Sequence, residues 1–167
     1  MHSTGSGCTY DDMRSMKNQN YDGIDRLTGL YNGEYALKEI QAYMEQNPEC
    51  TAAVYIMDID NFRTVDETLG RLFGNEIMKE IAAAICQVFR KQAVIGRIGG
   101  DKFLIFEKNY ESVGRIRENA KELCHRARST FKGEDQNFVI SLSIGIAIMP
   151  DDGYEWKQLA QHATQAL

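Results

Sequence analysis

Residues 93–107 read AVIGRIGGDKFLIFE, and the architecture of the chain can be predicted outward from them. They contain two short runs, 93–98 and 102–107, which are rich in the β-branched and aromatic side chains typical of strands. Gly99 and Gly100 separate the runs, and adjacent glycines permit the positive φ angles that a tight turn needs. The segment therefore predicts a β-hairpin with Asp101 near its tip.

The residues on both sides of the hairpin predict the other elements. Helices are expected over 31–46, 76–89, 111–131 and 154–167, and strands over 51–58 and 138–149. Asp60 is expected to cap a further short helix that opens at Asn61. In chain order, these elements predict an α+β fold in which helices flank a mixed sheet of the ferredoxin-like or polymerase-palm kind.

The composition is that of one globular domain with a polar extension. The 167 residues are 43% hydrophobic and 26% charged, which suits a single sizeable core. Residues 1–22 are interpreted as a linker or tag remnant that could include an N-terminal helix, and the domain is expected over 23–167.

Charge and cysteine content narrow the function classes. The net charge of −5 disfavours a nucleic-acid partner. The apolar runs are too short to span a bilayer, so this segment is expected to make no membrane contact. The four cysteines are scattered, which favours reduced thiols and a cytoplasmic location.

Two short segments carry candidate chemistry. Asp58-Ile59-Asp60 ends a predicted strand where a helix begins, a place where a carboxylate can hold a hard cation and backbone N–H groups can hold phosphate. The alternative is that Asp60 caps the helix and Asp58 is a solvated acid. With Asp101 as a second carboxylate, the pair could form a Mg²⁺ site for nucleotidyl transfer, although an ordinary turn explains Gly-Gly-Asp as well.

Five segments, in order and at matching spacing, resemble the GGDEF domains, which join two GTP molecules into cyclic di-GMP. They are 25–32 (DRLTGLYN), 58–75, 97–103 (RIGGDKF), 143–147 (SIGIA) and 150–153 (PDDG). The resemblance covers residues 25–167. It implies the nucleotidyl cyclase fold and a bacterial signalling protein with an upstream sensor domain.

The resemblance also assigns roles by position. Asp58 and Asp101 would be catalytic, because they and the carbonyl of Ile59 would hold two Mg²⁺ or Mn²⁺ ions. One domain holds one GTP, so catalysis would need two domains face to face in a homodimer. The substrate-binding positions would be the backbone near Asn61 and Phe62, the side chain of Arg63, and two residues facing the guanine, Asp66 and Asn75.

The signature loop departs from the family at one position. It consists of Gly99, Gly100, Asp101, Lys102 and Phe103. The family has Glu where this chain has Lys102, so an ammonium group would stand beside a metal ligand and repel a divalent ion. The alternative is that Lys102 points away from the site, since successive strand residues face opposite sides.

The base-recognition positions are exchanged. The family has Asn and then Asp, whereas this chain has Asp66 and then Asn75. A carboxylate suits the N–H donors of guanine, and an amide can serve either edge. Three interpretations stay open: guanine bound in a changed pose, relaxed base selectivity, or drift in an unused site.

Other departures lie outside these positions. The family's Arg-Arg pair is Gly33-Glu34 here, and its Gly-His is Gly70-Arg71. The product-inhibition motif R-x-x-D reads RKQA over 90–93, without its acid. The family's phosphate-clamping Lys and Arg correspond to positions beyond Leu167.

These observations lead to one principal hypothesis and two rivals. The first is a degenerate GGDEF domain with weak or no cyclase activity, which binds GTP or a related nucleotide as a sensing or dimerisation module. The alternative is an active diguanylate cyclase that tolerates the substitutions. A third interpretation, an RNA-binding sheet with Phe103 and Phe106 as stacking platforms, is disfavoured by the acidic charge.

Overall fold

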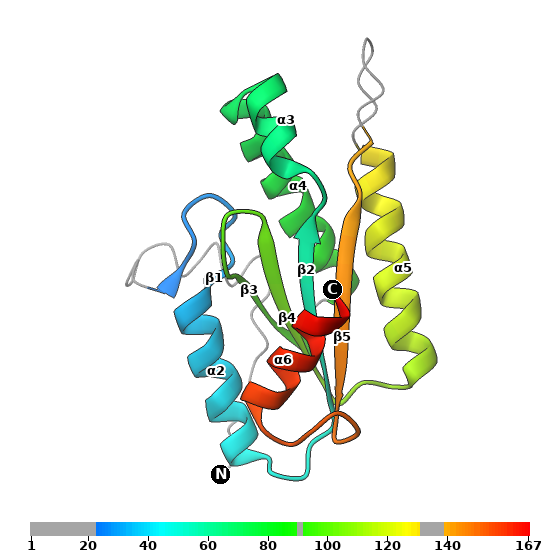
Figure 1. Cartoon of the computed structure of the whole chain (residues 1–167). Helices are drawn as coiled ribbons and strands as arrows, with labels where there is room; N and C mark the ends of the chain where they lie inside the picture. Colours follow the sequence, from blue (N-terminus) through cyan, green and yellow to red (C-terminus); the bar gives the residue numbers. More distant parts are fainter. Residues whose placement is uncertain (1–22, 90–91, 131–138) are drawn as a thin grey trace.

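The computed structural model describes residues 23–89, 92–130 and 139–167 (Figure 1). The linker and the helix expected within 1–22 lie outside these residues. The strands are β1 (Tyr31–Asn32), β2 (Ala52–Ile59), β3 (Ala93–Arg97), β4 (Lys102–Lys108) and β5 (Leu142–Met149). The helices are α2 (Gly33–Gln46), α3 (Phe62–Leu69), α4 (Arg71–Phe89), α5 (Val113–Thr130) and α6 (Trp156–Ala166). Over the described ranges, no helix combines the length and apolarity needed to cross a bilayer.

The strands form one mixed sheet in the order β1-β3-β4-β2-β5. β2 lies between β4 and β5 and is antiparallel to both, while β3 and β4 form the predicted hairpin. The short β1 pairs parallel with β3 at one edge. Helices α2 and α6 cover one face of this sheet and α4 and α5 the other, which confirms the α+β fold (Figure 1).

Both faces of β2 are buried, each in its own core. Tyr55 and Met57 pack with residues of α4 and α5, whereas Val54 and Ile56 pack with residues of α2 and α6. A strand covered on both faces is apolar at successive positions, which explains the uninterrupted apolar run in the sequence.

The aromatic residues of β4 lie inside these cores. Phe103 and Phe106 each have 0% of their surface exposed, and they pack on opposite faces of the sheet. A base-stacking platform needs exposed rings. The RNA-binding interpretation is therefore wrong.

The hairpin turn differs from its expected geometry. Among the glycines of the described residues, positive φ angles occur at Gly29, Gly70 and Gly153, and so not at Gly99 or Gly100. The Ile98 N–H donates to the Lys102 carbonyl at 3.0 Å, and this bond closes a four-residue loop. A loop of this length reverses the chain without the mirror-image turn that a two-residue hairpin requires.

Two helices begin away from their predicted first residues. Tyr31 and Asn32 pair with β3, so α2 begins at Gly33, where the Asn32 side chain caps it by accepting from the Tyr35 N–H at 2.9 Å. Helix α4 begins at Arg71 rather than at residue 76, because Gly70, at a φ of 85°, separates it from α3.

One buried polar group joins β4 to its neighbours. Glu107 is 5% exposed and accepts from the Tyr55 hydroxyl at 2.6 Å and from the Asn119 amide at 3.3 Å. Burial, followed by the hydrogen bond to Glu107, raises the pKa of Tyr55, so its hydroxyl keeps its proton at neutral pH. The network pins β2, β4 and α5 together.

The close contact between β5 and α6 yields a stability prediction. A Cβ added to Gly145 would lie 1.9 Å from the Ala163 carbonyl oxygen and 2.7 Å from the Leu167 backbone nitrogen. Gly145→Ala must therefore displace α6, and we expect a free energy of unfolding lower by about 2 kcal/mol in urea titrations. Gly100→Ala is the matched control, because nothing lies within 4 Å of its added Cβ. Equal losses in the two variants would contradict this packing argument.

Candidate functional site

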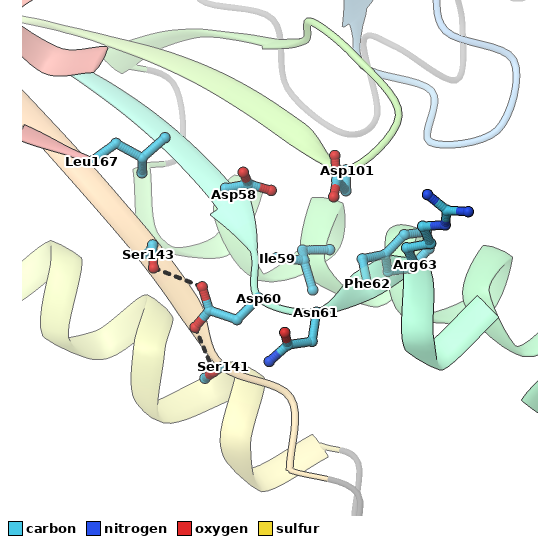
Figure 2. A pocket seen from close by; sticks show the side chains of 10 residues that line it. All are labelled: Asp58, Ile59, Asp60, Asn61, Phe62, Arg63, Asp101, Ser141, Ser143 and Leu167. Carbon is cyan, nitrogen blue, oxygen red and sulfur yellow. Dashed lines mark hydrogen bonds between the residues drawn. The ribbon is translucent and has the colours of Figure 1, made fainter. Parts of the chain in front are cut away.

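The carboxyl end of β2 and the tip of the β3–β4 hairpin meet at the same end of the sheet. The Ile59 N–H donates to the Asp101 carbonyl at 3.2 Å, which places Asp101 beside the strand end, as the sequence predicted. A pocket of about 600 Å³ opens there (Figure 2). Its lining residues are Asp58, Ile59, Asp60, Asn61, Phe62, Arg63, Asp101, Ser141, Ser143 and Leu167.

The pocket gathers six of the predicted site residues. They are Asp58, Ile59, Asn61, Phe62, Arg63 and Asp101. The two base-recognition positions, Asp66 and Asn75, do not line it and lie on α3 and α4. The helices are close there, because a Cβ added to Gly74 would lie 2.2 Å from Asp66 Oδ1. Of the signature loop, Gly99 and Gly100 are exposed beside the pocket and Phe103 is in the core.

Lys102 forms an ion pair with Asp58. The two residues are directly opposite each other in the antiparallel β2–β4 pairing, so their side chains share a face. The Lys102 Nζ lies 2.5 Å from Asp58 Oδ2, and 45% and 27% of the two side chains is exposed. The alternative in which Lys102 points away from the site is therefore wrong.

The electrostatics of the pair favour the charged lysine. The hydrogen bond to Asp58 raises the pKa of Lys102, partial burial opposes this rise, and the negative charges of Asp58 and Asp101 add to it. The ammonium therefore interacts with both acids that the resemblance assigns to metal binding. The other oxygen, Asp58 Oδ1, is buried without a hydrogen-bond partner among the described residues.

Asp60 has a different role from the predicted helix cap. Its carboxylate accepts from the Ser141 hydroxyl at 2.5 Å and from the Ser143 hydroxyl at 2.6 Å (Figure 2). Its backbone N–H donates to the Ser141 carbonyl at 3.0 Å. Asn61 is the residue at the cap position of α3, with a φ of 54° and no side-chain cap bond. Asp60 therefore fastens the β2–α3 turn to β5.

Neither serine has a role in the site predicted from the sequence. Both serines belong to the segment Ser141-Leu142-Ser143, where alternate residues of an extended chain face the same side. The separation of the two serines by one residue was the sequence signal that they face the same side. Asp60 could not be inferred as the partner of these serines, because β5 lies beside β2 only in the tertiary fold.

Arg97 holds the hairpin loop from the other side. One of its terminal nitrogens lies 3.1 Å from Asp25 Oδ1, while its Nε and its other terminal nitrogen donate to the Gly100 carbonyl at 3.1 and 2.6 Å. Asp25 also accepts from the Thr28 N–H at 2.8 Å and hydroxyl at 2.6 Å. The guanidinium thus links the segment that opens the domain to the signature loop.

Only part of the predicted metal-ligand set is free to bind a Mg²⁺ or Mn²⁺ ion, because Lys102 holds Asp58 Oδ2 while Asp58 Oδ1 has no partner among the described residues. Such ions take several oxygen ligands in near-ideal octahedral geometry. The Lys102 ammonium holds one oxygen of Asp58, and two serines hold both oxygens of Asp60. Across the described ranges, no three His, Cys, Asp or Glu side chains group in a way that could hold a metal ion.

The segment that corresponds to the family's product-inhibition motif is only partly described. Arg90 and Lys91 lie outside the described residues. Ala93, at the position of the family's acid, begins β3 and is 4% exposed. A buried methyl group offers no hydrogen bond to a guanine edge.

Comparisons with known proteins identify the family. The family model described as "Diguanylate cyclase, GGDEF domain" matches residues 23–167. Signaling protein YkoW of Bacillus subtilis is 28% identical over 146 residues, which are 86% of this chain and 18% of that protein. Cyclic di-GMP phosphodiesterase PdeR of Escherichia coli is 29% identical over 143 residues, 86% of this chain and 22% of that protein. The chain thus spans about a fifth of these curated relatives.

A solved structure gives the same result for the fold. The GGDEF domain of TpbB, also called YfiN, from Pseudomonas aeruginosa is 25% identical. It superposes with a TM-score of 0.78 over 86% of this chain and 85% of that one.

The Arg97 contacts generate a stability prediction. The side chains of Arg97 and Asp25 are 17% and 21% exposed, so removing the guanidinium leaves a half-buried carboxylate without its cation. We expect Arg97→Ala to lower the free energy of unfolding by about 1–3 kcal/mol and to speed amide exchange in the loop.

The control is an exposed ion pair of the same length. Arg115 and Glu118 are also 3.1 Å apart, but their side chains are 53% and 68% exposed. Arg115→Ala should change stability by less than about 0.5 kcal/mol. Indistinguishable urea midpoints for the two variants would refute the anchoring role of Arg97.

Proposed function

The chain belongs to the GGDEF family of diguanylate cyclase domains, and we propose that it is a nucleotide-binding member with weak or no cyclase activity. In this proposal it is a sensing or dimerisation module of a longer cyclic di-GMP signalling protein. One observation carries the proposal: the Lys102 ammonium lies 2.5 Å from the carboxylate that the family pattern assigns to metal binding.

The chemistry of cyclisation explains why this pair matters. In the family's reaction, divalent metal ions would activate the attacking 3′-hydroxyl and neutralise the triphosphate. An ammonium carries one positive charge and offers no coordination position to a hydroxyl oxygen. It can bind phosphate, but it cannot make the hydroxyl a better nucleophile in the same way.

The proposed substrate site lies between the end of β2 and the hairpin. Phosphates would meet the first N–H groups of α3, near Asn61 and Phe62, where the helix dipole favours an anion. The Arg63 side chain is 91% exposed and paired with Glu67 at 2.8 Å. Such an exposed pair is worth at most about 1 kcal/mol, so Arg63 can exchange Glu67 for a phosphate at little cost.

The base would lie beyond the phosphates, toward α3 and α4. Asp66 lies on α3 and Asn75 on α4, and neither lines the pocket proposed for the phosphates. A carboxylate at Asp66 can accept from the N–H groups of guanine, and the Asn75 amide can serve an acceptor or a donor. We propose GTP or a related nucleotide as the ligand on this chemistry.

Features of the relatives support a module within a larger protein. PdeR is named for phosphodiesterase activity, which shows that a domain like this one occurs in proteins named for another reaction. The proposed setting is a cytoplasmic signalling protein with a sensor domain. Any residual catalysis would require a homodimer, because one domain offers one substrate site.

The alternative, an active diguanylate cyclase, is tested directly. The purified protein is incubated with GTP and Mg²⁺ or Mn²⁺, and cyclic di-GMP is measured by chromatography. We expect GTP binding with little or no product. Sustained multiple turnovers would replace the proposal with the active alternative.

Replacing Lys102 gives a sharper prediction. Lys102→Glu removes the ammonium from Asp58 and restores the family's residue. We expect Mg²⁺-dependent GTP binding to tighten about tenfold, equivalent to about 1.4 kcal/mol, in calorimetric titrations. Turnover need not return, since Asp66 and Asn75 still differ from the family pattern.

Lys79→Glu is the control for the change in net charge. Lys79 is half exposed on α4 and pairs with Glu76 rather than with a pocket residue. Its replacement should leave metal-dependent affinity unchanged. The interpretation fails if both charge reversals tighten binding equally, or if neither does.

A further inference from the structure

The position of Lys102 supports a more specific inference, which rests on the proposed nucleotide binding. Its Nζ donates to Asp58 Oδ2 at 2.5 Å and interacts electrostatically with Asp101. In the family pattern these same two acids hold the metal ions. One side-chain cation therefore pairs with the first carboxylate and lies within electrostatic range of the second.

An ammonium group can bridge a carboxylate and a phosphate. It has three N–H donors, and the bond to Asp58 uses one of them. The remaining two can donate to phosphate oxygens, and 45% of the Lys102 side chain is exposed to solvent. The Lys102 ammonium can thus connect Asp58 to a phosphate group without a metal ion.

We propose that this site binds the phosphates of a nucleoside triphosphate directly, with the Lys102 ammonium in place of a divalent metal ion. Arg63, which lines the pocket together with Asp58 and Asp101, supplies a second positive charge. The N–H groups at the start of α3 supply donors for the remaining oxygens. The ligand class is a polyphosphate without a bound metal ion. The site binds this ligand without activating it for cyclisation.

Added magnesium would oppose this arrangement. A Mg²⁺ ion carried by the triphosphate would approach the Lys102 ammonium and be repelled by it. It would also compete with that ammonium for Asp58. The expected affinity for GTP is therefore at least as high in EDTA as in Mg²⁺, the reverse of what a metal-dependent site gives.

The test is isothermal titration of the 167-residue chain with GTP, once in EDTA and once in Mg²⁺. The expected result is a dissociation constant in EDTA equal to or below that in Mg²⁺. Lys102→Met keeps much of the side-chain length without the charge, and it should weaken binding in EDTA at least tenfold. Inorganic tripolyphosphate, titrated in EDTA, should show the same dependence on Lys102, because the bridge contacts phosphate alone.

The outcomes separate this inference from the function on which it rests. Binding that is measurably tighter in Mg²⁺ than in EDTA, or EDTA binding that survives Lys102→Met, overturns the inference and leaves nucleotide binding intact. Absence of binding in both buffers overturns nucleotide binding itself, and the inference with it. Lys79→Met controls for loss of one positive charge and should retain full affinity, and circular dichroism of each variant confirms that it is folded.

Discussion

The pairing register of β2 with β4 determines the rest of the site. It sets Asp58 opposite Lys102 and Met57 opposite Phe103, and the Ile59 N–H continues it with a hydrogen bond to the Asp101 carbonyl. A shift of one residue would move every side chain of β4 to the other face of the sheet. The core would then have to bury Lys102, and Phe103 would stand at the pocket. The apolar cores on both faces therefore fix the geometry of the ion pair.

The same constraint explains which features were predictable. Strands, helices and the hairpin follow from local patterns of apolar and β-forming residues, and the order of the motifs indicated the fold. The direction of Lys102 depends on the register, and the role of Asp60 depends on serines that reach it only through β5. Strand β1 has two residues and exists because β3 lies beside it, so periodicity could not reveal it. The features that could not be predicted from the sequence all depend on tertiary contacts.

Two sets of polar contacts hold the backbone around the pocket. Asp60 and its two serines fasten the start of α3 to β5, while Arg97 ties the hairpin loop to Asp25 at the start of the domain. Both devices keep backbone N–H groups and carboxylates in place without using the oxygens of Asp58. A substitution at Lys102 can therefore change the charge of the pocket while these supports remain.

At residue 102 the chemistry of the site can change without a change in the fold. Replacing the family's Glu by Lys changes the local charge by two units, yet the backbone pairing of β4 does not depend on which side chain residue 102 carries. The lysine even joins the two strands, since it pairs with Asp58 across them. The buried core of the described residues consists of apolar side chains such as Phe103 and Leu104 and includes neither Asp58 nor Lys102. A member of the family can thus keep its architecture while the charge beside Asp58 changes, and its function has to be inferred from this site rather than from its fold.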